Sequence, residues 1–343
     1  MKRFIYTTIA LAAVAVGCTK SNLVEGPQSM ETPIEFETYN GRTPLTKASE
    51  ITNTTIQGEG FHVTAFYSVD NSVYMDRDVT WSEGAWTYSP KAYWPATGDL
   101  NFVAYGLNAK NTLVVSDDHL TFTYTVPDVV ADQEDLVASK FGDSTKSADD
   151  NGKVTIQMQH LLSKIGFQVK TIYTGNAPDA QVTIKNITLK GEFNKTGSVN
   201  LKPAADETFK ITPTADTEKA ASYALFADGE SFTAGASADA QPIYCNSVSN
   251  PDESSRYMMI MPGNIGQKPT IEVEYKLTGQ NDFQKAVIDL QKPTGTENTT
   301  VPWTLEAGTA YEFIFTVSIS SIDFTGEVVK WDELEKPIPE QGA

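Results

Sequence analysis

Strict alternation of apolar and polar residues is the feature that most constrains the fold of this chain. Over residues 120–126, four apolar side chains alternate with three threonines, and the same period of two recurs over 165–171, 271–277 and 311–319. A β-strand with one buried face requires this period, because successive side chains point to opposite sides of the sheet. Turn-forming clusters such as 149–152 separate these segments, and no helical period is sustained after the N-terminal segment. Many short strands with frequent turns predict an all-β protein built from β-sandwiches.

The N-terminal residues have the order of a secretory signal peptide. Two basic residues precede a run, 4–16, that is apolar apart from Thr7 and Thr8 and is followed by Gly17 and Cys18. The run is shorter than the roughly 20 residues that a membrane-spanning helix needs. Its ending resembles a bacterial lipobox, in which the cysteine receives acyl chains such as palmitate and becomes the mature N-terminus. We therefore expect a signal peptide over 1–17 and a lipidated tether over 18–32, held at a membrane by about 0.8 kcal/mol for each buried CH₂.

Charge, cysteine count and length limit the class of protein. The formal net charge is -18, and loss of the two basic residues of the signal peptide makes it -20 (24 basic minus 44 acidic residues). So acidic a surface repels nucleic acid, and we exclude nucleic-acid binding. With Cys18 acylated, Cys245 has no partner for a disulfide, so stability must come from burial. A length of 343 residues suggests two domains, and a polar stretch near residue 150 places their boundary between 33–151 and 152–343.

Residues that could carry catalysis or bind a metal are few and scattered. The three histidines, His62, His119 and His160, show no metal-ligand spacing, and no histidine lies near Cys245 in sequence. The motifs of serine hydrolases, zinc proteases and phosphate-binding loops are absent. We therefore expect no catalytic residue, no metal and no cofactor, and predict that the protein is not an enzyme.

Two further features allow more than one interpretation. Trp81, Trp86 and Trp94 are close in sequence and could form a platform for stacking sugars, but a sandwich core uses the same residues, and we favour the core. Acidic pairs such as Asp117-Asp118 could serve glycoside hydrolysis only if the fold brought two carboxylates face to face. Turn formation is the commoner role of such pairs.

A series of motifs follows the order found in a known family. They are Ala92-Tyr93-Trp94-Pro95 with 100–105, Asp135-Leu136-Val137-Ala138, His160 to Phe167, Met258 to Pro262, Glu306 to Phe313, and Val328 to Trp331. With the lipobox, they resemble the fimbrillin (Mfa-like, type V pilin) family, the lipoprotein-derived fimbrial subunits of Bacteroidales-type Gram-negative bacteria. The resemblance covers nearly the whole mature chain. It implies two tandem transthyretin-like β-sandwich domains after a lipoprotein signal peptide.

The resemblance also implies assembly by strand exchange. In similar proteins a trypsin-like protease removes the lipidated leader and the first strand, and a segment of another subunit fills the groove. Arg42 and Lys47 are the candidate processing residues, although both could equally be surface-loop charges. The candidate first strand precedes them, and its alternation turns Ile34, Phe36 and Thr38 to one face.

The C-terminal segment is the candidate donor strand. It spans 327–338, with Val328, Val329 and Trp331 as the expected anchors. The same residues could instead form the closing strand of their own domain, and the sequence leaves both interpretations open.

Together these features predict a structural subunit (stalk, tip or anchor) of a surface fimbria, or pilus, with a role in adhesion. Its expected location is the cell outer membrane and the fimbrium. The expected partners are copies of itself or other fimbrial subunits, the outer membrane through the lipid, and a host or bacterial surface ligand. The alternative is a surface lipoprotein that binds glycans in a polysaccharide-uptake system, which exposed coplanar tryptophans would favour. A β-sandwich hydrolase is a third interpretation.

Overall fold

The computed structural model of the protein describes residues 32–39, 55–108, 113–142, 145–146, 152–171, 181–214, 219–237, 239–243, 257–266, 268–290, 304–317 and 322–330. The chain divides after residue 31, and every described residue belongs to the second unit. These residues form strands almost throughout, with one five-residue helix, α1 (Thr55–Glu59), and one 3-10 turn, η2 (Val130–Asp132). The predicted all-β class is confirmed. In the part of the chain that the structure describes, no helix has the length and apolar character needed to cross a bilayer.

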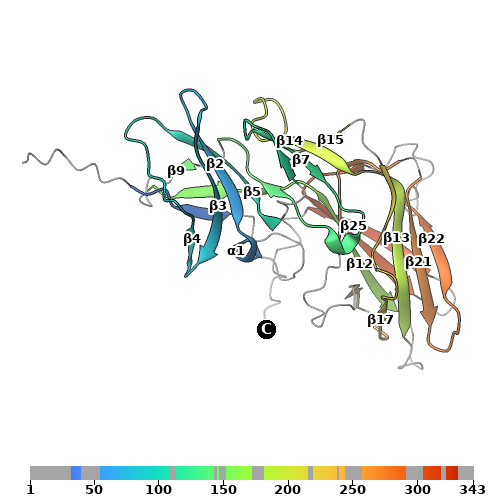
Figure 1. Ribbon diagram of the computed structural model, residues 1–343. Helices are drawn as coiled ribbons and strands as arrows, with labels where there is room; N and C mark the ends of the chain where they lie inside the picture. The colour runs from blue at the N-terminus through green and yellow to red at the C-terminus, as the bar shows by residue number, and fades with distance from the viewer. Residues whose placement is uncertain are drawn as a thin grey trace, which may run out of the picture. The chain divides into compact units, whose positions relative to one another are not determined.

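A six-stranded antiparallel sheet dominates the N-terminal part of the fold (Figure 1). In sheet order its strands are β11 (Gln159–His160), β8 (Val137–Ala138), β5 (Leu100–Gly106), β2 (Phe61–Tyr67), β3 (Val73–Ser82) and β4 (Ala85–Thr87). One face of this sheet and the three-stranded sheet β1 (Phe36–Tyr39), β10 (Val154–Gln157) and β9 (Thr145–Lys146) contribute to a single core. The two sheets therefore pack as a β-sandwich, and its buried side chains include Phe36, Phe61, Trp86, Phe102 and Val154.

Two further sheets enclose the larger C-terminal core. The first has the order β18 (Gln241–Pro242), β12 (Ser163–Thr171), β24 (Thr309–Val317), β25 (Ile322–Lys330), with β19 (Tyr257–Ile260) also paired to β12. The second has the order β16 (Lys219–Ala224), β13 (Val182–Asn194), β21 (Thr270–Leu277), β22 (Gln284–Asp289), with β17 (Phe232–Ala234) also paired to β13. A small pair, β20 (Gly263–Asn264) and β23 (Thr304–Leu305), completes this part.

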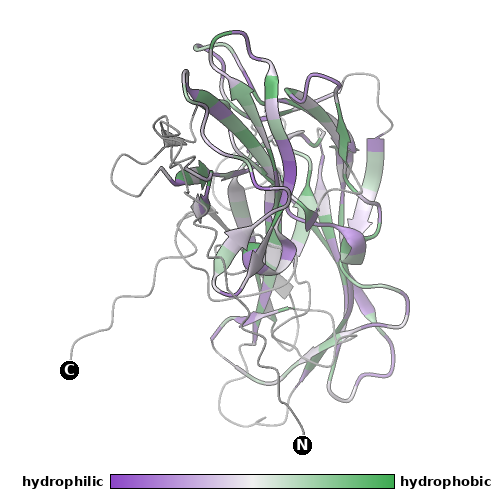
Figure 2. Cartoon of the chain, turned by 60° about the vertical axis from the view of Figure 1, so that its left-hand side comes forward, coloured by the Kyte–Doolittle hydropathy of each residue, from purple (hydrophilic) through white to green (hydrophobic). Residues whose placement is uncertain are grey.

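Each alternating segment predicted from the sequence contributes a strand over its described residues. In β21, Ile271, Val273 and Tyr275 are buried while the residues between them are partly exposed, as a period of two requires. Figure 2 shows apolar and polar residues alternating along the strands. The last alternating segment departs from the expected half-buried antiparallel strand. Its strand, β24, pairs parallel with β12 and antiparallel with β25, and even Glu312 is buried, because β24 is an interior strand covered on both faces.

Strands from both sides of residue 151 share three sheets. β1 pairs with β10, β8 pairs with β11, and β7 (Thr121–Thr125) pairs with β14 (Thr196–Asn200). The last pair lies in a four-stranded sheet with β15 (Ile211–Pro213) and β6 (Leu113–Val115). The boundary between 33–151 and 152–343 stays a prediction. The strand pairing shows that residues before and after residue 151 contribute strands to the same sheets.

Candidate assembly interface

The first strand lies at the edge of its sheet. β1 pairs in parallel with β10, with Phe36 opposite Val154, and no described strand pairs with its other edge along 36–39. The strand predicted over 34–38 begins two residues later than expected, although Ile34 is held in place just before it. Ile34 and Phe36 are 0% and 4% exposed, whereas Glu37 is exposed and Thr38 is half-buried. The alternation therefore turns the two large apolar side chains into the core.

Backbone hydrogen bonds hold the beginning of this segment to the loop that contains Ala92 and Trp94. The Ile34 N–H donates to the Ala92 carbonyl at 2.9 Å, and the Trp94 N–H donates to the Thr32 carbonyl at 2.9 Å. The Tyr88 hydroxyl donates to the Ile34 carbonyl at 2.7 Å. Burial, with a further contribution from nearby acidic charge, raises the pKa of Tyr88, so the hydroxyl keeps its proton at neutral pH. In each of these three hydrogen bonds, the atom that the first-strand segment contributes is a main-chain atom.

On the opposite side, the chain leading into β10 holds the same segment. The Val154 N–H donates to the Glu35 carbonyl at 2.8 Å. Lys153 Nζ lies 3.1 Å from Glu37 Oε1, and both side chains are well exposed to solvent, so this ion pair stabilises the strand by about 1 kcal/mol or less. The ion pair therefore adds little to the backbone hydrogen bonds and the side-chain burial that hold the strand.

Phe36 fills an aromatic pocket. Its ring centroid lies 5.5 Å from that of Tyr88, 5.8 Å from that of Phe61 and 6.1 Å from that of Phe102, and the last two contacts are edge-to-face. Edge-to-face geometry is favourable because the positive ring edge meets the negative ring face. We call the surface that this segment covers the first-strand slot, formed by these three rings and by the backbone edges at Ala92 and 153–157.

The tryptophans belong to the same core. Trp86 is 7% exposed and packs edge-to-face on Trp81 at 5.2 Å, while Trp94 packs on Phe102 at 5.9 Å. The Trp94 Nε1–H donates to the Gly152 carbonyl at 3.0 Å. Trp86 is a core residue, as interpreted from the sequence, and Trp81 and Trp94 are partly buried against the same core. The edge-to-face packing of Trp81 on Trp86 differs from the coplanar platform that sugar stacking requires.

The last described strand closes its own sheet. In β25, Val328 lies opposite Tyr311 and Val329 lies opposite Ala310 of β24. This is the closing-strand arrangement that the sequence left open. Among the described strands, β25 pairs with β24 alone, so its other edge is the outer edge of that sheet. Trp331 lies outside the described residues.

Cys18, Arg42 and Lys47 also lie outside the described residues. Their roles in lipidation and processing stay predictions.

The histidines have structural partners. His62 lies between two carboxylates of β3, with Nε2 at 2.8 Å from Asp76 and Nδ1 at 2.6 Å from Asp78, and it stacks on Tyr105. His119 Nδ1 lies 3.3 Å from the same Asp76 carboxylate. Burial alone would raise the pKa of Asp76, but hydrogen bonds with His62 and from the Thr64 hydroxyl, with a further contribution from His119, hold it below the usual value. The described residues contain no cluster of His, Cys, Asp and Glu that could hold a metal ion.

Three of the sequence motifs meet where the N-terminal and C-terminal sheets join. His160 Nδ1 lies 2.8 Å from the fully buried carboxylate of Asp135, and the Ser163 hydroxyl donates to the Glu306 carbonyl at 2.8 Å. Gly308 adopts a positive φ of 63°, and a Cβ there would lie 3.2 Å from the His160 carbonyl oxygen. These contacts connect β8 and β11 to β12 and β24.

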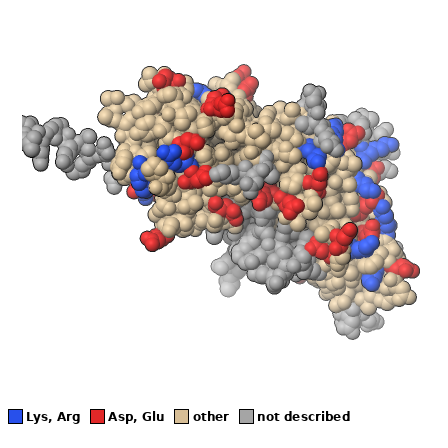
Figure 3. Space-filling model, viewed as in Figure 1, with Lys and Arg blue, Asp and Glu red and all other residues tan. Residues whose placement is uncertain are grey.

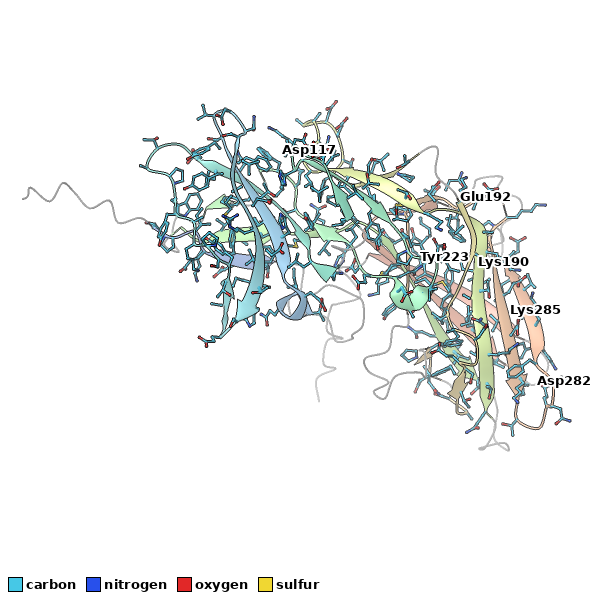
Figure 4. All side chains as sticks on the ribbon, viewed as in Figure 1. Asp117, Lys190, Glu192, Tyr223, Asp282 and Lys285 are labelled. Carbon is cyan, nitrogen blue, oxygen red and sulfur yellow. The ribbon has the colours of Figure 1, made fainter. Side chains whose placement is uncertain are left out.

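The outer face of the β13–β21–β22 sheet is a solvated surface. Acidic and basic side chains are mixed there, as the space-filling view shows over the C-terminal part (Figure 3). Lys190 and Lys285, labelled in Figure 4, both contact the Glu272 carboxylate between them. Hydrogen bonds from Lys190 and then Lys285 lower the pKa of Glu272. Such a cross-strand charge ladder favours solubility and gives no indication of a partner.

Sequence reasoning identified the first strand but missed most of the slot that receives it. Phe61, Tyr88 and Val154 were not singled out. The alternation of Trp86, Thr87 and Tyr88 was a usable signal for an aromatic pair on one face, but no local pattern indicates that residue 154 pairs with residue 36.

Comparison with known proteins agrees with this architecture. The model of the fimbrillin-like family matches residues 40–331. A candidate cell adhesion protein from Bacteroides uniformis has a TM-score of 0.53 and 15% identity, over 88% of this chain and 99% of that chain. A similar protein from Bacteroides ovatus has a TM-score of 0.51 and 15% identity, over 87% and 97%. Mfa3, the tip fimbrial protein of Porphyromonas gingivalis, aligns with a TM-score of 0.43 and 8% identity, over 80% and 94%. No curated protein sequence matches significantly. The chain belongs to the fimbrillin-like family.

Proposed function

We propose that this protein is a structural subunit of a surface fimbria, as stalk, tip or anchor, and that it assembles by exchanging its first strand. The observation that carries the proposal is the construction of the first-strand slot. An edge strand inserts two apolar side chains, Ile34 and Phe36, into a sandwich core and is otherwise held mainly through its backbone.

A strand held in this way is replaceable. If it were removed, the Val154 N–H would lose its partner, the Ala92 carbonyl would lose the Ile34 N–H, and the pocket of Phe36 would be exposed. Unpaired strand edges beside apolar pockets are templates for another strand, because any extended segment can restore the main-chain hydrogen bonds. Side chains at alternate positions then decide which segment fits.

Proteolysis supplies the release step. Arg42 and Lys47 follow β1 within eight residues of its end at Tyr39, so a cut after either one separates β1 from the rest of the fold. The leader that would leave with β1 contains Cys18. A subunit that keeps its lipid would remain an anchor at the outer membrane, and a cut subunit would enter the fimbrium.

The C-terminal segment of another subunit is the proposed replacement, with Val328, Val329 and Trp331 among its contacts. Because Val328 and Val329 pair with β24 in the isolated chain, donation requires this end of β25 to leave its sheet. The adhesive role would belong to the assembled fimbria.

Cleavage at a single residue tests the proposal. The mature chain has three arginines, Arg42, Arg77 and Arg256, so an arginine-specific protease has few sites. The protein, without its signal peptide, is treated with this protease, the cut site is mapped by mass spectrometry, and the product is examined by size-exclusion chromatography and unboiled SDS gels. We expect the uncut protein to be monomeric and the protein cut at residue 42 to form slowly dissociating oligomers.

The matched control is Arg42→Gln, with Lys47→Gln examined in the same way using a lysine-specific protease. Blocking the relevant cut should keep the protein monomeric under identical treatment. A product cut at residue 42 or 47 that stays monomeric at high concentration contradicts strand exchange. It would favour the glycan-binding alternative, which sugar-binding assays on the intact protein then examine.

A further inference from the structure

The tripeptide that fills the first-strand slot occurs a second time in the chain. Ile34-Glu35-Phe36 enters the core, and the pattern Ile-acid-Phe recurs only at Ile322-Asp323-Phe324 in the 343 residues. The second copy begins β25, the last described strand.

The slot selects its occupant at two positions. Most of its polar contacts are to backbone atoms of the first strand, and the exception is the exposed Glu37–Lys153 ion pair. The side chains that decide which strand fits the slot are therefore those at the positions of Ile34 and Phe36. These two residues are 0% and 4% exposed. An occupant needs a β-branched residue and, two residues later, a phenylalanine.

The position of the second copy makes it available. A related sequence, Val273-Glu274-Tyr275, lies in β21, which pairs with β13 on one side and β22 on the other. In contrast, β25 pairs with β24 alone among the described strands. Among the described strands, only the ladder with β24 has to break for Ile322 and Phe324 to leave.

We infer that the strand that replaces β1 is the beginning of β25 from a second copy of this chain, with Ile322 in the site of Ile34 and Phe324 in the site of Phe36. This inference rests on the proposed strand exchange and extends the donor N-terminally from 327–338. The donor strand runs parallel to β10, as β1 does, and this places Phe324 opposite Val154.

The remaining positions are compatible with this register. Asp323 takes the place of the exposed Glu35, and its carbonyl accepts the Val154 N–H. Thr325 takes the place of Glu37, so only the exposed ion pair with Lys153 is lost. Residues from 327 onward then continue along the slot beyond the place of Thr38.

Competition between peptides tests the assignment. Protein cut at residue 42 and freed of its first strand in mild denaturant is titrated with fluorescent peptides of residues 31–39, 320–330 and 327–338, followed by fluorescence anisotropy. We expect 31–39 and 320–330 to bind with dissociation constants within about tenfold of each other and 327–338 to bind more weakly, because only the first two carry both apolar anchors.

Two variant peptides identify the anchors. Phe324→Ser in the 320–330 peptide should weaken binding by at least about 100-fold, since a buried phenylalanine is lost. Asp323→Asn, at the exposed position, should change binding by less than about threefold, as expected for a surface substitution. These substitutions are made in the peptide, so folding of the protein is unaffected.

The outcomes separate this inference from the proposed function. If 31–39 binds and 320–330 does not, or if Phe324→Ser binds like its parent, the assignment of Ile322 and Phe324 is overturned while strand exchange stands. Tighter binding of 327–338 than of 320–330 overturns it as well. If 31–39 itself fails to bind, the slot does not accept a free strand, and both proposals fall.

Discussion

Truncation of Phe36 measures how much of the stability of the uncut protein comes from the first strand. Phe36→Ala removes a ring that is 4% exposed and that contacts Phe61, Tyr88 and Phe102. Removing a buried phenylalanine costs about 3–5 kcal/mol, the sum of lost transfer free energy and the cavity left behind. Because whole domains are stable by about 5–15 kcal/mol, this loss is a large fraction of the total.

The assay is urea unfolding followed by tryptophan fluorescence, in which Trp86 reports on the same core. With an m-value of about 3 kcal/mol/M, the substitution should lower the unfolding midpoint by about 1 M or more. Hydrogen exchange of the 34–39 amides provides a second measurement. If β1 can open without unfolding the rest, its protection falls further than that of β2.

Glu37→Ala is the matched control on the same strand. It removes only the exposed contact with Lys153, so the free energy of unfolding should change by about 1 kcal/mol or less. If Phe36→Ala costs no more than Glu37→Ala and leaves the exchange of 34–39 unchanged, the first strand does not depend on the aromatic pocket. The description of a slot that selects its strand by the fit of two buried side chains would then be wrong.

Three further changes test other parts of the structure. Asp76→Asn should destabilise the protein most above about pH 5 and progressively less at lower pH. The pKa of the wild-type carboxylate is lowered in the folded protein, so its contribution to stability is lost as the pH falls and the carboxylate is protonated. Urea melts of the two proteins between pH 3 and 7 that differ by a constant amount would contradict this. Gly166→Ala places a Cβ about 2.6 Å from Glu312 Cδ and should cost about 1–3 kcal/mol by urea unfolding, with Glu312→Ala relieving the penalty; additive losses in the double variant would exclude that contact as the cause. Cys18→Ser should release the protein from the membrane fraction and abolish lipid labelling; unchanged fractionation would contradict lipid anchoring.

Local alternation predicted the strands because it reflects a local requirement. A strand with one buried face must place apolar side chains at every second residue, so 120–126 and 271–277 could be recognised without knowing their neighbours. The burial of Ile34 and Phe36 followed from the same rule. Neighbours in the sheet are set by contacts between distant residues. The parallel pairing of β1 with β10 joins residues 36 and 154, and no property of either segment alone indicates it.

Alternation misled where a strand is covered on both faces. It placed Glu312 on a solvent-facing side, but β24 lies between β12 and β25 and Glu312 is buried opposite Gly166. The absence of a side chain at Gly166 leaves room for the carboxylate, and Gln168 approaches it at 3.5 Å. A polar residue at an interior position depends on such partners, and they become visible only once the pairing of the two strands is known.

The proposed exchange also needs a reason to proceed in one direction, and the tether provides it. While β1 is joined to the fold through residues 40–54, its effective concentration at the slot is in the millimolar range, which a donor from another copy cannot exceed in dilute solution. A cut at Arg42 or Lys47 removes this advantage, and the released leader then competes only at its own low concentration. If the donor carries the same Ile-acid-Phe pattern, its packing at the two buried sites nearly matches the packing of the strand that leaves. Proteolysis would then favour exchange by removing the tether, and the donor would still have to give up its own pairing with β24.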